Sequence, residues 1–209
     1  MRSFLFNRRT LFMVGLLLLL SITFCVPQSM AAKNNYNMDL SQEQINFYCQ
    51  MMSENYRLPL EEVVFYSQYH SIQDLDRYAF LAYACQRDLD YVIEMKNKNT
   101  WARTEFMLGL TPNELKAAEF MCDANKLYVG LQMDYTIALG ILRQNFDVYE
   151  TAMSMLLAEK SKKVPLEIAK MKTPNMSWTE LAKKIGVNEQ NFNEIEAKIN
   201  NCPNLNYLP

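Results

Sequence analysis

The chain has 209 residues, 50% of them hydrophobic, with 21 basic and 23 acidic residues and a formal charge of −2. This balance argues against a nucleic-acid partner, because such a partner normally requires a basic face on the protein. The chain is long enough for one domain with a proper core, or for two small ones.

Residues 1–31 have the three parts of a signal peptide for the general secretory route. The positive segment, the apolar run and the small-residue cleavage site are Arg2, Arg8 and Arg9, then Leu11 to Val26, then Ser29-Met30-Ala31. We therefore expect a periplasmic or secreted protein with no stable membrane span after cleavage. Two alternatives stay open: an uncleaved anchor helix, and a lipid on Cys25, whose flanking residues fit a lipobox poorly.

Cleavage after residue 31 removes three arginines and no acids, so 18 of the 21 basic side chains and all 23 acidic ones remain, a net charge of −5. Four cysteines also remain, and an even count in an exported chain suggests one or two disulfides. The alternative is buried free thiols, because three of the four lie in apolar helical stretches. The cysteines are Cys49, Cys85, Cys122 and Cys202.

Residues 32–40 are polar and predict a flexible start. The first helical half is expected over residues 41–120 and begins at Ser41, which forms a capping-box pattern with the glutamine three residues later. Pro59 opens the next helix. The apolar run from Val63 to Tyr69 could be a strand by its length, but the proline and two glutamates before it favour a helix.

Two stretches share one pattern of a helix, a glycine stop and a second helix. The first is centred on Trp101 and Gly109. The second is centred on Trp178 and Gly186, with the same spacing between tryptophan and glycine, and Ser177 caps it. Apolar residues at helical spacing put each tryptophan on an inward face, and the glycines can take the left-handed conformation that ends a helix.

Weaker copies of this pattern predict four degenerate helix-turn-helix units in two tandem halves. The units are marked by Ile72, Trp101, Phe146 and Trp178, and Asn145 is the expected cap of the third. The second half is expected over residues 121–200, followed by an irregular tail over 201–209. Fixed-period similarity indicates a stacked helical array, so we predict an all-α fold of about eight to ten short helices.

The stretch Ser-Trp-x-Glu-Leu-Ala-x-x-Ile-Gly-Val-x-x-x-x-Phe is similar to the helix-turn-helix of DNA-binding regulators. That resemblance would place the second helix, Glu189 to Ile199, in a DNA groove. The helix is rich in acids and amides and has one lysine, Lys198, so it would repel phosphate. DNA binding is therefore the weaker alternative, and the same unit serves here for packing.

No residue pattern predicts catalysis, a cofactor or a metal. The single histidine, His70, cannot form the usual histidine-rich metal site, and no nucleotide-binding, nucleophile-elbow or zinc-protease motif is present. Carboxylates pair at Glu61 and Glu62 and at Asp74 and Asp76, but these positions are expected helix starts, where acids complement the helix dipole.

The sequence therefore predicts an exported, non-enzymatic module that binds a protein or peptide, or has a structural role, in the bacterial envelope. The alternative function is a hydrolase of cell-wall material that uses Glu61, Glu62 or Asp74. A deep cleft holding two carboxylates with raised pKa values would favour the hydrolase.

Overall fold

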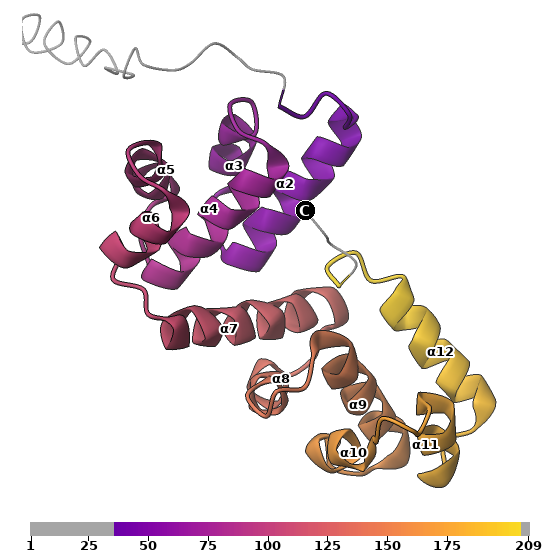
Figure 1. Cartoon of the computed structure of the whole chain (residues 1–209). Coiled ribbons are helices and arrows are strands. Elements are labelled where there is room, and N and C mark those ends of the chain that lie inside the picture. The colour runs from indigo at the N-terminus through magenta and orange to yellow at the C-terminus, as the bar shows by residue number, and fades with distance from the viewer. Residues whose placement is uncertain (1–35, 206–209) are drawn as a thin grey trace, which may run out of the picture. The chain divides into compact units, whose positions relative to one another are not determined.

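The computed structural model describes residues 36–205, and all eleven regular elements in that range are α-helices (Figure 1). The all-α prediction is confirmed, with one helix more than the expected upper limit. The first five helices are α2 (Gln42–Tyr56), α3 (Leu60–Tyr66), α4 (Ile72–Cys85), α5 (Leu89–Asn97) and α6 (Trp101–Met107). The other six are α7 (Pro112–Leu131), α8 (Tyr135–Leu142), α9 (Val148–Ser161), α10 (Pro165–Met171), α11 (Trp178–Lys184) and α12 (Glu189–Asn200).

The expected signal peptide, residues 1–31, lies outside the described residues. Among the helices that are described, none combines the length and the apolar character needed to cross a bilayer.

Polar side chains cap most of the helix starts. Complete capping boxes form at four N-caps: Ser41, Thr111, Asp147 and Ser177. One predicted cap was wrong. Asn145 has a φ of 65° and lies outside the helix, whereas the Asp147 carboxylate accepts from the Glu150 amide at 2.7 Å and caps α9. A carboxylate at this position also meets the positive end of the helix dipole.

Both predicted glycine stops are confirmed. Gly109 follows α6 with a φ of 74°, and Gly186 follows α11 with a φ of 85°. Without a β-carbon, glycine takes this left-handed conformation at little cost. Each short tryptophan-bearing helix therefore ends in a sharp turn into the longer helix that follows.

The buried apolar side chains form two clusters. The first lies among α2 to α6, and its fully buried members include Met52, Leu75, Leu81 and Leu89. The second lies among α8 to α12, and its fully buried members include Ile141, Met153, Leu157 and Leu181. Trp101 packs against the first cluster and Trp178 against the second, and both indoles are half-buried.

Helix α7 lies between the helices of the two clusters (Figure 1), and its side chains contribute to both. Its first part contributes Leu115 and Cys122 to the first cluster, and its second part contributes Leu127 and Leu131 to the second. A fully buried leucine such as Leu127 stabilises a fold by about 1.5–3 kcal/mol, so the second cluster depends strongly on this helix, and the first cluster takes its buried Cys122 from it. The expected boundary between residues 120 and 121 falls inside α7, which the two expected halves therefore share.

The start of the described chain is held in place by one asparagine. The Asn37 side-chain amide donates to the carbonyls of Ser67 and His70, both at 3.1 Å, and its oxygen accepts from the Ile72 amide at 3.0 Å. Residues 36–40, which were expected to be flexible, are therefore fastened to the α3–α4 connection. The polar composition of residues 36–40 gave no indication of this attachment.

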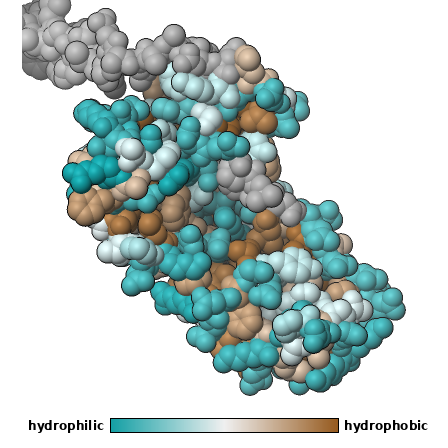
Figure 2. Space-filling model, viewed as in Figure 1, coloured by the Kyte–Doolittle hydropathy of each residue, from teal (hydrophilic) through white to brown (hydrophobic). Residues whose placement is uncertain are grey.

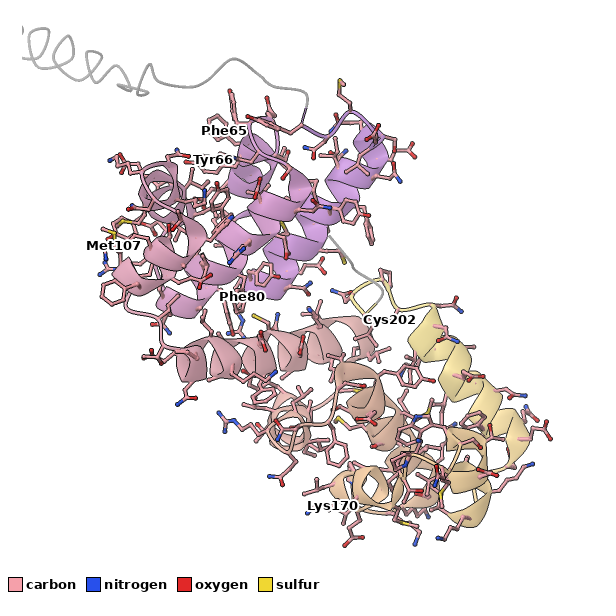
Figure 3. The ribbon with its side chains drawn as sticks, viewed as in Figure 1. Phe65, Tyr66, Phe80, Met107, Lys170 and Cys202 are labelled. Carbon is pink, nitrogen blue, oxygen red and sulfur yellow. The ribbon has the colours of Figure 1, made fainter. Side chains whose placement is uncertain are left out.

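The viewed surface is mainly hydrophilic, with a few apolar patches (Figure 2). One exposed apolar pair lies at the end of α6, where Phe106 is 71% exposed and Met107 44% exposed. Figure 3 shows Met107 at this end of the helix, far from the labelled Cys202.

Candidate binding site where α2, α4 and α7 meet

Helices α2, α4 and α7 pack on one another, and a buried amide fixes α7 against the end of α2. The Asn125 side chain donates to the main-chain carbonyls of Glu54 at 2.8 Å and Asn55 at 3.3 Å. Its oxygen accepts from the Arg57 guanidinium at 3.2 Å. Asn125 is 3% exposed. Helix ends leave carbonyls without intrahelical partners, and Asn125 supplies partners to two carbonyls in the last turn of α2.

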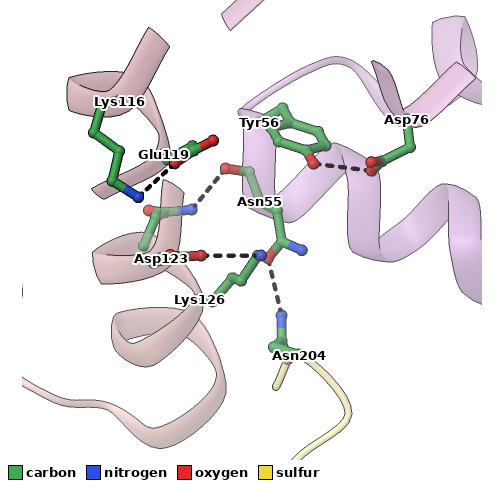
Figure 4. A network of polar contacts seen from close by, with 9 residues as sticks. Asn55, Tyr56, Asp76, Lys116, Glu119, Asp123, Lys126 and Asn204 are labelled. Carbon is green, nitrogen blue, oxygen red and sulfur yellow. Dashed lines mark hydrogen bonds and ion pairs between the residues drawn. The ribbon is translucent and has the colours of Figure 1, made fainter. Parts of the chain in front are cut away.

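The segment after α12 returns to the same place. Asn204 donates to the Glu54 carboxylate at 3.3 Å. It also donates to the Asn55 side-chain oxygen at 3.5 Å (Figure 4). Asn55 is fully buried, and its side-chain nitrogen has no hydrogen-bond partner among the described residues. The three asparagines Asn55, Asn125 and Asn204 therefore join the first helix described, the shared helix and the end of the described chain.

Tyr56 links α2 to α4 beside this network. Its hydroxyl donates to the Asp76 carboxylate at 2.9 Å (Figure 4). Burial, reinforced by the nearby charge of Asp76, raises the pKa of Tyr56. The phenol therefore stays protonated at neutral pH and can donate to the carboxylate.

The larger pocket at this junction has a volume of about 520 Å³, within the usual range for a ligand pocket. We call it the arginine pocket, and its main lining residues are Tyr56, Arg57, Ala84, Arg87, Glu114 and Ala117. Among the described residues neither arginine forms an ion pair. Glu114 is already engaged, because it accepts from the Thr111 amide at 2.8 Å and the Thr111 hydroxyl at 2.7 Å.

A second pocket of about 370 Å³ is also lined by Tyr56 and lies between α4 and α7. We call it the paired-charge pocket, and its charged lining residues are Asp76, Arg77, Glu119, Asp123 and Lys126. Arg77 pairs with Glu105 at 2.9 Å, Lys126 with Asp123 at 3.1 Å, and Glu119 with Lys116 at 2.8 Å. Its cations are neutralised within the protein, unlike those of the arginine pocket.

The carboxylates considered for a hydrolase, Glu61, Glu62 and Asp74, do not form one site, because Glu62 and Asp74 have different surroundings. Glu62 is half-buried near Asp88 and Asp90, and burial together with these two charges raises its pKa. Asp74 instead accepts from the Ser71 hydroxyl at 3.0 Å at the start of α4. Glu61 is exposed, and neither pocket at the junction is lined by Glu61, Glu62 or Asp74.

His70 lies in a row of rings. Its imidazole centroid is 5.2 Å from that of Tyr78 and 6.2 Å from that of Tyr66. Burial lowers the pKa of His70, which favours the neutral ring. Figure 3 shows Tyr66 beside Phe65 on α3. Among the described residues no group of three or more histidine, cysteine or acidic side chains could hold a metal ion.

The expected disulfides do not form. All four described cysteines are free thiols, and Cys49, Cys122 and Cys202 are buried. Cys49 packs inside the first cluster, whereas the sulfur of Cys202 lies against Gly130 in α7. Burial raises the pKa of Cys122 to about 12. The tail is therefore held by the Asn204 hydrogen bonds and the packing of Cys202, without a disulfide.

The two tryptophans share one kind of contact. The Lys96 ammonium lies 4.8 Å from the Trp101 ring centroid, and the Lys172 ammonium lies 5.4 Å from that of Trp178. Such contacts stabilise by about 0.5–1 kcal/mol at exposed sites. Both indoles also pack against an apolar cluster, and neither lines the arginine pocket.

Sequence reasoning missed Arg57, Arg87 and the three asparagines. Single polar residues at helix ends resemble ordinary surface residues. The two arginines are far apart in the sequence and converge only through tertiary packing. The left-handed backbone at Arg57, with a φ of 57°, gave no sequence signal either, because Gln86, Gln132 and Lys162 end their helices in the same conformation. Comparison of the chain with protein-family models, curated proteins and solved structures gives no match.

Proposed function

We propose that this protein is an exported, non-enzymatic helical module that binds a protein or peptide partner in the bacterial envelope. The observation that carries the proposal is the arginine pocket, where two arginines that form no ion pair with the described residues flank a surface of small and aromatic side chains. Pockets of this size with a few polar groups are typical of binding sites. The leader-like residues 1–31 support export, and the acidic balance argues against DNA.

Site-specific photo-crosslinking in cells tests this function. A photoreactive amino acid replaces Ala117, an exposed residue of the arginine pocket, in the full chain. The matched control carries it at Ala197, an exposed position on α12. We expect a discrete protein adduct in the envelope fraction from the Ala117 variant alone. Adducts that are absent, or equal at the two positions, would sink the proposal.

A cell-wall hydrolase is the second candidate, and the raised pKa of Glu62 is the observation that favours it. A general acid needs such a shift. The placement of Glu62 outside both pockets at the junction weighs against it. A murein-release assay decides, because an enzyme would lose its activity on substitution of Glu62 by glutamine, whereas a binding module shows none in either form.

We also infer that the chain is built from two tandem halves that share α7. Helices α3 to α6 begin at residues 60, 72, 89 and 101, and α8 to α11 begin at 135, 148, 165 and 178. Helix α7 begins at 112 and α12 at 189. The shift between corresponding helices is thus nearly constant along the chain, and Lys96 and Lys172, which lie above the two tryptophans, are related by the same shift.

Corresponding positions also make corresponding contacts. Asn125 of α7 packs on Asn55 of α2, and at the matching places of the second half Cys202 packs on Gly130. A finer division into four units has less support, because Ile72 begins a helix whereas Phe146 precedes one. An experimental structure in which residues 57–131 did not superpose on residues 132–202 would contradict the tandem halves.

A further inference from the structure

We propose that the arginine pocket binds an acidic peptide segment through the carboxylates of its aspartate or glutamate side chains. The inference rests on the proposed binding function and adds the chemistry of the partner. Its basis is an imbalance of charge at a site built from three helices.

Two positive charges in the pocket have no negative partner among the described residues. Arg57 contacts the neutral amide of Asn125, at 3.2 Å. The Arg87 guanidinium lies 5.6 Å from the Tyr91 ring centroid. Glu114, the acid in the lining, is held in the Thr111 capping box, and these hydrogen bonds lower its pKa. Guanidinium groups pair well with carboxylates, through two parallel hydrogen bonds.

The rest of the junction makes the contrast clear. In the paired-charge pocket Arg77 and Lys126 each have a carboxylate within 3.1 Å. The cations of the paired-charge pocket are thus neutralised by carboxylates of the described chain, whereas those of the arginine pocket are not. Electrostatic complementarity then selects an anionic partner.

The second half of the chain gives an internal comparison. By helix position, Ala84 of α4 corresponds to Lys160 of α9, and Ala117 of α7 corresponds to Glu194 of α12. Lys160 and Glu194 form an ion pair at 3.9 Å across α9 and α12. In the first half the same two places are alanines that line the arginine pocket. The small side chains leave open a space that the second half covers with a pair of charges.

Peptide binding to the purified full chain tests the inference. The probe is fluorescein-labelled hexaglutamate with an amidated C-terminus, so that all the carboxylates of the peptide itself are on side chains, and hexaglutamine with the same label is the control probe. We expect saturable binding of hexaglutamate alone, followed by fluorescence anisotropy at low ionic strength. Arg57→Gln or Arg87→Gln should weaken it about tenfold, as expected for loss of a charge-assisted hydrogen bond.

Arg143→Gln is the matched charge control, because Arg143 is exposed in the second half and lines neither pocket. It should bind hexaglutamate like the unaltered protein. Arg57→Gln keeps the fold, because Gln132 occupies the corresponding left-handed position after α7 with a φ of 58°. Equal weakening by Arg143→Gln would show only general attraction to net charge and would overturn the proposal.

A second variant closes the pocket without removing either arginine. The double substitution Ala84→Lys with Ala117→Glu transfers the ion pair of the second half and leaves the net charge unchanged. It should abolish binding of hexaglutamate, whereas Lys160→Ala with Glu194→Ala should have no effect. Retained binding in the closed variant would overturn the proposal, and so would binding to phosphatidylglycerol vesicles in place of the peptide.

The outcome is separable from that of the proposed function. A protein adduct at Ala117 without hexaglutamate binding would reject the acidic partner and keep the binding module. If neither the adduct nor hexaglutamate binding is observed, both the binding module and the acidic partner are rejected.

Discussion

Cys202 packs directly on Gly130, with its sulfur 2.5 Å from the place that a β-carbon on that glycine would occupy. Asn204 lies close by on the same glycine, with its β-carbon 3.0 Å from that place. Because Gly130 in α7 has no side chain, the segment that follows α12 can pack closely against the helix at this position. Figure 3 shows Cys202 in that segment.

Gly130→Ala should lower the free energy of unfolding by about 1–3 kcal/mol, the usual cost of overpacking. Gly140→Ala is the control, because nothing lies within 4 Å of its added β-carbon in α8. That change should stabilise by about 0.5–1 kcal/mol, since alanine favours helix. Urea denaturation measures both, and Cys202→Ala should restore part of the loss in the Gly130→Ala protein. Equal effects at the two glycines would refute the contact.

Asn125→Ala should destabilise the protein by about 1–3 kcal/mol, because buried carbonyls at the end of α2 lose their donor. The matched control is Asn193→Ala, an exposed position on α12. That change should stay within about 0.5 kcal/mol. Thermal or urea unfolding followed by circular dichroism gives the comparison, and a loss at Asn125 no larger than that at Asn193 would exclude a structural role for the asparagine network.

Glu62→Gln should raise the melting temperature at pH 7. The pKa of Glu62 is raised in the folded state, so folding favours its protonated form, and this advantage disappears as pH rises through the folded-state pKa. Glutamine resembles the protonated acid, so the gain should be present at pH 7 and vanish below the ordinary glutamate pKa of 4.5. Glu159→Gln, at an exposed site, serves as the control. A gain that was independent of pH would contradict the assignment.

Thiol titration should separate Cys85 from the other three described cysteines. In the native state a disulfide reagent should modify Cys85, which is half-buried, faster than Cys49, Cys122 or Cys202, which are buried. The thiolate is the reactive form, and burial raises the pKa of Cys122 to about 12. In denaturant without reductant, all four should react. Fewer than four reactive thiols among these residues would mean that a disulfide had formed.

Local rules predicted the helical class and most helix ends. Capping boxes and glycine stops act within a few residues, so Ser177 and Gly186 could be interpreted from the sequence alone. Asn145 was misjudged because an asparagine can serve a turn as well as a cap. The left-handed backbone of Asn145 shows that it forms a turn and does not cap the helix.

The candidate site could not be predicted in the same way. Arg57 and Arg87 converge because α2 and α4 end beside the start of α7, and such convergence leaves no periodic signal. Free thiols were the alternative that the sequence left open, because an even cysteine count permits pairing without requiring it. In the structure all four described cysteines are free, and Cys49 and Cys202 belong to different apolar clusters.

Because α7 contributes side chains to both apolar clusters, it links the unfolding of one to the unfolding of the other. A break anywhere along this helix strips apolar side chains from one cluster or the other, so neither set of helices is expected to survive as an isolated fragment. Heating should therefore produce a single melting event, and a protease that nicks α7 should degrade the whole body without leaving a resistant half.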